Sequence, residues 1–239
     1  MKFIQFIPAA LALSFFCAST QALPTIQHQE KAVDILKRGN SNAVDAVIKV
    51  FVDAEAKILA KACVDLEVAV CADLIVKVNA NANVLGGLVK VNANVKDLEV
   101  RAKAAADAEI KAMIKADAKA LVLANIDAHV RAVVDKICPV CDHVCLNKNA
   151  RTIVAKVDAL IKVDVAKLAV KVKADAAVHA KVRVSAFIKD LSLRLGVANA
   201  DIHAIVRIRS DIDIHVKAFI ELCAKLFVKA GLVAKVAAL

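Results

Sequence analysis

The spacing of apolar residues along most of the chain predicts long amphipathic helices. Apolar side chains recur three and four residues apart over residues 44–70, 110–137 and 154–172, which places them on one face of a helix. Alanine, lysine and aspartate fill the other positions, and alanine favours helix intrinsically. Ser41-Asn42 offers an N-cap for the first of these stretches.

One segment follows a different period. Residues 205–216, IVRIRSDIDIHV, alternate apolar and polar side chains, which is typical of a half-buried strand. The alternation stops at Ala218-Phe219, whereas helical spacing from Ile205 continues to Phe227. Because the helical pattern survives over the longer window, we predict a helix through residues 205–227.

The helix-breaking residues suggest how the helices are divided. They are Gly86-Gly87, Pro139, and Gly196 with Asn199, and they leave about four segments of roughly 30–45 residues. Short connections make consecutive helices antiparallel. We therefore predict an all-α fold, an elongated bundle of about four long amphipathic helices arranged as two αα-hairpins.

Residues 76–95, VKVNANANVLGGLVKVNANV, fit this scheme least well. Five asparagines and two glycines are poor helix formers, and the alternation is strict. We favour frayed helix ends that meet at Gly86-Gly87. The alternative is a short β-hairpin that turns at these glycines, and such a hairpin needs a partner surface to be stable.

The N-terminal residues predict export. Lys2 precedes an apolar run that ends near Ala18, and Thr20-Gln21-Ala22 offers a cleavage site, so residues 1–22 resemble a signal peptide. Lys37-Arg38 is either the end of a propeptide, residues 23–38, or an ordinary basic helix end. We therefore expect a secreted, extracellular protein.

The predicted organisation after this processing is a single helical domain, residues 39–239. Its halves, residues 41–137 and 149–239, are joined by a cysteine-rich turn at residues 138–148.

Six cysteines follow the signal peptide, and an even number in an exported chain predicts three disulfides. Cys63 and Cys71 are eight residues apart on one predicted helix, too far along it to pair with each other. The bundle topology places Cys63 and Cys223 at similar heights, so we hypothesise a bridge between them. The six are Cys63, Cys71, Cys138, Cys141, Cys145 and Cys223.

The motif CPVCDHVC, residues 138–145, is the most distinctive in the chain. We interpret it as a disulfide-stapled turn between helices. A zinc site is the alternative, with Cys138, Cys141, His143 and Cys145 as candidate ligands. A redox Cys-x-x-Cys pair would require a thioredoxin-like βαβ setting, which the pattern does not predict.

The composition argues against several functions. The chain has a net charge of +10, but basic and acidic residues are interspersed and aromatic residues make up 3%, so nucleic acid is not an expected partner. No later segment is apolar over about 20 residues, so no transmembrane span is expected. The histidines at 129, 179, 203 and 215 show no paired spacing, and no nucleophile or phosphate motif occurs. We expect neither enzymatic activity nor a cofactor.

These features leave two hypotheses for the function. An apolar fraction of 60%, mostly small side chains, favours a secreted protein that binds fatty acid or lipid in a slot between helices, or that binds a hydrophobic surface. The alternative is an extracellular structural or interaction protein that docks on wall polysaccharide or a host protein and has no small-molecule ligand.

Overall fold

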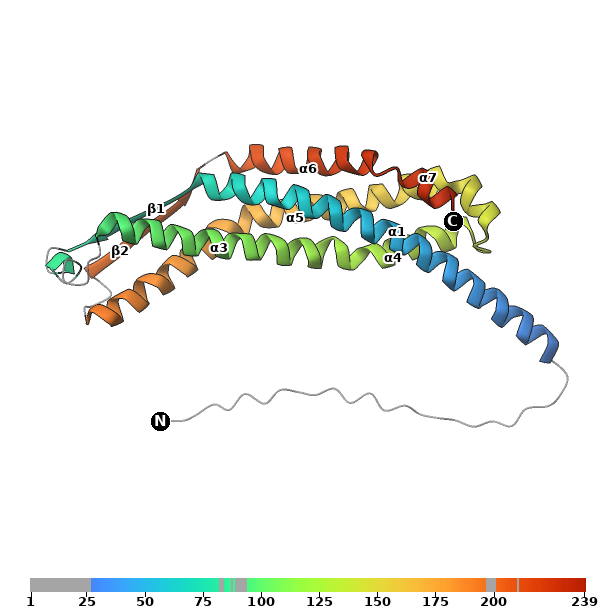
Figure 1. Ribbon diagram of the computed structural model, residues 1–239, viewed down its shortest axis with the longest axis horizontal. Coiled ribbons are helices and arrows are strands. Elements are labelled where there is room, and N and C mark those ends of the chain that lie inside the picture. Colours follow the sequence, from blue (N-terminus) through green and yellow to red (C-terminus); the bar gives the residue numbers. More distant parts are fainter. Residues whose placement is uncertain (1–26, 82–83, 87, 89–93, 197–200, 210) are drawn as a thin grey trace.

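Long helices run side by side along the length of the molecule (Figure 1). The computed structural model describes residues 27–81, 84–86, 88, 94–196, 201–209 and 211–239, with side chains from residue 42 onward. The helices are α1 (Gln27–Asp73), α3 (Val95–Leu121), α4 (Ile126–Ile137), α5 (His143–Leu195), α6 (Ile212–Lys229) and α7 (Leu232–Ala237), with a 3-10 turn at Leu123–Asn125 and two strands, β1 (Leu74–Ala80) and β2 (Ile202–Ile208).

The core lies between helices that approach closely. α5 packs against α3, α4, α6 and α7, while α1 packs against α3, α4 and α6. Ala102 and Ala106 of α3 and Ala176 and Ala180 of α5 are completely buried. Small side chains at these positions allow the two helices to pack closely.

Side-chain caps and glycines set the helix ends. The Oδ1 atom of Asn94 accepts a hydrogen bond from the Asp97 N–H at 2.7 Å, and that of Asp142 accepts one from the Cys145 N–H at 2.7 Å. Both satisfy a backbone donor that has no partner within the first helical turn. Gly196 ends α5 with a φ of +66°, as its sequence position predicts.

The two strands form a small antiparallel sheet that lies against α3 and α5. Val76 is paired with Val206, and the side chains of Leu74, Val76 and Val78 are buried. The outer edge of β1 is also occupied, because the Val78 N–H donates to Glu99 Oε1 at 3.0 Å. Helix contacts thus provide the surface that a two-stranded sheet needs.

The predicted helix over residues 205–227 is wrong at its start. Residues 202–208 form β2, and helix begins only at Ile212. The local alternation prevails because Leu74–Ala80 supplies a strand with matching register. A pattern confined to one segment does not reveal that partner.

Both predictions for residues 76–95 are also wrong in part. Residues 76–80 belong to strand β1 and are not a frayed helix end. The strand pairs with β2, far away in the sequence, rather than folding back as a hairpin. Residues 84–86 are helical, and Gly87 and residues 89–93 lie outside the described residues.

The helix boundaries differ from the predicted division into four. α1 runs through Ser41-Asn42, which therefore do not cap its start. α1 has 47 residues, α5 has 53 and α6 has 18, while Leu123–Asn125 interrupts the second predicted helix. The predicted signal peptide, with Ala22, lies outside the described residues, and Lys37-Arg38 lies within α1.

Candidate functional site

A surface groove of about 410 Å³ lies between α1, α6 and α7. Its apolar lining comes from Val50, Ala54 and Ile58, spaced four residues apart on α1, and from Leu226 and Ala230 at the end of α6. The spacing places all three α1 residues on one face of that helix. The volume is within the usual range for small-ligand sites.

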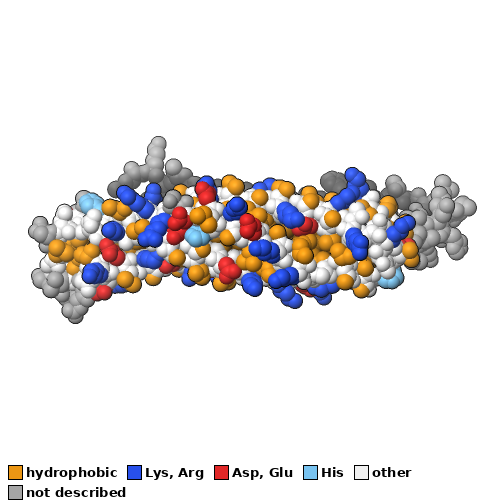
Figure 2. All heavy atoms as spheres, turned by 90° about the horizontal axis from the view of Figure 1, so that it is seen from above, with side chains coloured by type: hydrophobic (Ala, Val, Ile, Leu, Met, Phe, Trp, Pro, Cys, Tyr) orange, Lys and Arg blue, Asp and Glu red, His pale blue; other side chains and the backbone are white. Residues whose placement is uncertain are grey.

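Basic side chains surround this groove. Lys57, Lys61, Lys229 and Lys235 line it, against a single acid, Asp53. Among the described residues, none of these four lysines has a carboxylate within ion-pair distance. Figure 2 views the face that carries α6 and shows basic side chains along it with apolar patches between them. The groove thus combines an apolar lining with uncompensated positive charge.

The helix that follows α6 contributes to the groove. Gly231 has a φ of +62°, a conformation that disfavours other residues. The chain bends there and continues as α7 toward the same end of the molecule (Figure 1), where α7 packs against α5 and α1 with Leu232 and Val236 buried. This packing places Lys235 beside the groove.

A buried carboxylate lies behind the groove. Glu55 follows Ala54 on α1, is 2% exposed, and has one oxygen, Oε2, with no hydrogen-bond partner among the described residues. It shares a cavity of about 20 Å³ with Asp158, Cys223 and Phe227. Burial, with a further contribution from the charge of Asp158, raises the pKa of Glu55 to about 7.

Thiols lie next to this carboxylate. Cys63 and Cys223 are buried and do not form the predicted bridge. Burial, the charge of Glu55 and the charge of Cys63 raise the pKa of Cys223 to about 12, which places both thiols within electrostatic reach of each other. Burial and the charge of Glu67 raise the pKa of Cys63 to about 11.

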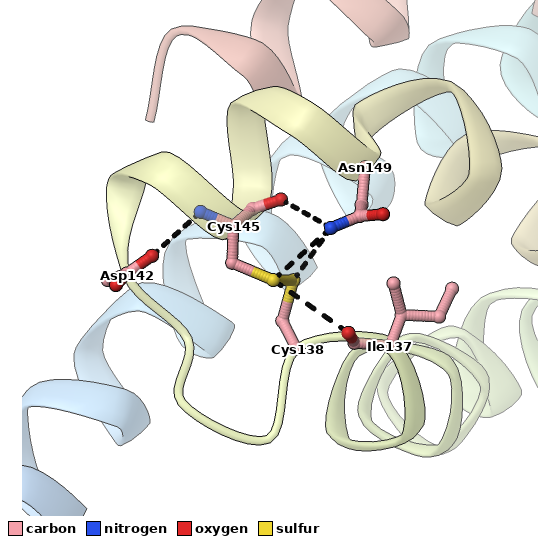
Figure 3. Close-up of a disulfide and its surroundings, with 5 residues drawn as sticks. All are labelled: Ile137, Cys138, Asp142, Cys145 and Asn149. Atoms are coloured by element: carbon pink, nitrogen blue, oxygen red, sulfur yellow. Dashed lines mark hydrogen bonds between the residues drawn. A yellow bond between two sulfur atoms is a disulfide. The ribbon is translucent and has the colours of Figure 1, made fainter.

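The cysteine-rich turn contains the disulfide in the described part of the chain (Figure 3). Cys138 at the end of α4 is bonded to Cys145 in the first turn of α5, which confirms the predicted stapled turn. Asn149 donates from Nδ2 to the Cys145 carbonyl at 3.0 Å and lies beside both sulfurs. The predicted set of three disulfides is not formed.

This pairing removes two alternatives for the motif. Cys138 and Cys145 have no thiolate to offer zinc, His143 is exposed, and Cys141 is buried outside the disulfide. Cys138 is not paired with Cys141, as a redox Cys-x-x-Cys requires. Within the described residues, no cluster of three or more metal-binding side chains occurs. Cys71, the remaining predicted disulfide cysteine, is a buried thiol on α1.

Three of the histidines that show no paired spacing in the sequence lie beside carboxylates in the structure. His215 lies 2.8 Å from Asp73, His179 lies 3.4 Å from Glu109, and His129 lies 2.7 Å from Asp164. Only the last pair involves a carboxylate buried to 2% exposure. His203, by contrast, is exposed on β2.

Asp164 is the centre of a polar cluster between α5 and α4. It accepts hydrogen bonds from Asn125 and Lys167 as well as lying beside His129. Burial by itself raises the pKa of Asp164, but the hydrogen bonds from Lys167, His129 and Asn125 outweigh it and hold the pKa below its ordinary value.

Sequence reasoning missed the buried carboxylates Glu55 and Asp164, although a signal was present. Glu55 lies four residues after Phe51 and three before Ile58, and Asp164 lies between Ile161 and Leu168. All of these apolar neighbours are buried. A carboxylate within an apolar stripe predicts either a polar cluster or a perturbed pKa.

None of the known protein families, curated proteins or solved structures matches this chain. Within the described residues, no helix has the length and apolarity needed to cross a bilayer. The chemistry of the groove is therefore the basis for a proposed function.

Proposed function

We propose that this protein binds anionic amphiphiles, with fatty acids as the representative class, in the groove between α1, α6 and α7. The observation that carries the proposal is the combination of an apolar lining with four lysines that lack ion-pair partners in the described structure. An acyl chain removes the apolar lining from water. A carboxylate or phosphate head group accepts hydrogen bonds from the lysines.

The proposal treats the protein as a secreted, non-enzymatic binder. Export would deliver it to an extracellular setting where free fatty acids need a carrier. Mass spectrometry of the mature protein tests this part: a start at Leu23 supports signal cleavage alone, and a start at Gly39 supports additional cleavage after Arg38. An intact Met1 contradicts export.

Displacement of a fluorescent fatty-acid probe tests the groove. The charge-reversing variant Lys57→Glu/Lys61→Glu should bind the probe about tenfold more weakly, because two attractions become repulsions. The matched control is Lys217→Glu/Lys225→Glu, which makes the same charge change at exposed positions of α6 outside the groove. The control should bind the probe as the wild type does.

A second variant tests the apolar lining. Ala230→Phe places an aromatic ring in the groove and should reduce the capacity for the probe without changing the net charge. Organic extraction followed by mass spectrometry should also release fatty acid or lipid from the purified protein. A clean extract and no probe binding would reject the proposal and favour the alternative, a structural or interaction protein with no small-molecule ligand.

A further inference from the structure

Helix α5 is apolar on two sides. One side is buried in the core, where Leu168 and Val172 are completely covered. The other side carries a row of valines that the described residues leave exposed, with Ala166 and Ala174 between them. The valines and their exposed fractions are Val163 (53%), Val170 (67%), Val178 (56%) and Val182 (66%).

These valines form a continuous row. Together with the two alanines, the valines follow one another at intervals of three or four residues. Residues at this spacing are neighbours on the surface of a helix. The row extends for about 28 Å at 1.5 Å per residue. Isolated exposed valines are ordinary, but a row of this length needs a partner.

The same helix carries most of the excess positive charge. α5 contains eleven lysines and arginines and four aspartates, a net charge of +7, whereas the whole chain has +10. One of the four aspartates, Asp164, is buried and ion-paired. Lys162, Lys167, Lys171, Lys173 and Lys181 are all exposed on the segment that carries the row. The first four lie within ion-pair distance of Asp158, Asp164, Asp175 and Asp213, respectively, whereas Lys181 has no such partner among the described residues.

We infer that the outer face of α5, from Val163 to Val182, docks on an anionic lipid bilayer. Valine side chains enter the boundary between head groups and acyl chains, while the flanking lysines contact lipid phosphates. The charge complementarity selects this partner over a second copy of the chain, because α5 as a whole has a net charge of +7 and pairing two copies of this helix would bring like charges together. Nucleic acid offers phosphates but no apolar layer for the valines.

This inference goes beyond the proposed function, since the groove residues lie on α1, α6 and α7 and the docking face lies on α5. The two are separable by experiment. Lys57→Glu/Lys61→Glu should bind the fatty-acid probe about tenfold more weakly and still bind vesicles as the wild type does. If the protein binds vesicles but does not bind the probe, the docking face on α5 is supported and the proposed fatty-acid groove is rejected.

Co-sedimentation with vesicles tests the docking face. The full chain should bind vesicles of phosphatidylcholine that contain about one third phosphatidylglycerol, and bind pure phosphatidylcholine at least about tenfold more weakly. Val170→Ser/Val178→Ser should weaken binding to the anionic vesicles about tenfold, because both side chains lose their insertion into the bilayer. The matched control, Val64→Ser/Val68→Ser, changes two exposed valines on α1 and should leave binding unchanged.

Several results would overturn the inference. Equal loss in the two serine variants, or no loss in either, means that the valine row does not contact lipid. Equal binding to neutral and anionic vesicles removes the electrostatic component. Sedimentation velocity that shows a dimer dissociated by Val170→Ser/Val178→Ser assigns the row to a second copy. Displacement from vesicles by excess double-stranded DNA, with the valine variant unaffected, assigns the face to nucleic acid.

Discussion

Two carboxylates in this protein are buried to the same extent but lie in opposite electrostatic surroundings. Glu55 faces α5 and α6, Asp164 faces α4, and each residue is 2% exposed. The pKa of Glu55 is raised to about 7, whereas the pKa of Asp164 is lowered. Donors make the difference, because three side chains donate to or lie beside Asp164 while Glu55 Oε2 has no partner among the described residues.

The comparison shows that burial alone does not decide the charge of a carboxylate. Desolvation raises the pKa in both places, and only hydrogen bonds and neighbouring cations reverse the shift. The sign determines how each region responds to pH. Glu55 lowers the free energy of unfolding as the pH rises from about 4.5 to about 7. Asp164 contributes stability above its ordinary pKa of 3.8, and this contribution is lost as the pH falls through its lower folded-state pKa.

The largest expected effect comes from removing the charge of Glu55. Glu55→Gln should raise the free energy of unfolding by about 3 kcal/mol at pH 8 relative to its effect at pH 4, because the wild type must bury an ionised group only at the higher pH. Urea unfolding at both pH values measures this. Glu221→Gln, on the exposed face of α6, is the control, and parallel pH profiles for wild type and Glu55→Gln would contradict the pKa of about 7.

The next effect tests the polar cluster. Asp164→Asn should lower the free energy of unfolding by about 2 kcal/mol at pH 7, because the donors around it lose a charged acceptor. The loss should shrink as the pH falls through the lowered pKa of Asp164, because the wild-type carboxylate is then itself protonated. Asp65→Asn on the exposed face of α1 should be neutral. Equal stability of the two variants would mean that the hydrogen bonds to Asp164 only offset the cost of burying its carboxylate and add no net stability.

A smaller effect separates the donors. Asn125→Ala should cost about 1 kcal/mol, since it removes the hydrogen bonds to Asp164 and to the Leu121 carbonyl. It should also move the acid limb of the stability profile to higher pH by raising the pKa of Asp164. Asn147→Ala, at an exposed position of α5, controls for the substitution. If the stability at low pH is unchanged, Asn125 does not influence the pKa of Asp164 and stabilises only the turn between α3 and α4.

The smallest effect belongs to the exposed partner. Lys167 lies 2.9 Å from Asp164, but its side chain is 61% exposed, so Lys167→Gln should cost about 0.5 kcal/mol and less at high salt. The control is Lys181→Gln on the same helix. A loss of stability as large as that of Asp164→Asn would show that the ion pair with Lys167, rather than the neutral donors, keeps Asp164 ionised.

Features that depend on residues close together in the sequence were predicted, whereas features that depend on distant segments were not. Helical faces around Val47 and Val130, the end of α5 at Gly196 and the stapled turn from Cys138 to Cys145 follow from patterns within one segment. The β1–β2 pairing joins residues more than a hundred positions apart. Neither strand predicts the other, because their alternation sets the face of each residue but not the partner.

The groove, like the pairing of β1 with β2, depends on contacts between segments that are far apart in the sequence. Ile58 and Leu226 each lie on an ordinary apolar stripe, and only the crossing of α1 with the end of α6 and with α7 makes them one groove. Lys57 and Lys235 come close to the same cavity for that reason. The local pattern of charges, spread evenly along the chain, does not predict such a convergence.

Local sequence was sufficient for the mainly helical character and for the turn that the disulfide closes, because both depend on residues within a few turns of one another. The sheet, the groove and the opposite pKa shifts of Glu55 and Asp164 depend on which helices lie side by side. Burial and the supply of donors are properties of that packing. A carboxylate has the same intrinsic chemistry in both positions, and its neighbours in space determine its charge.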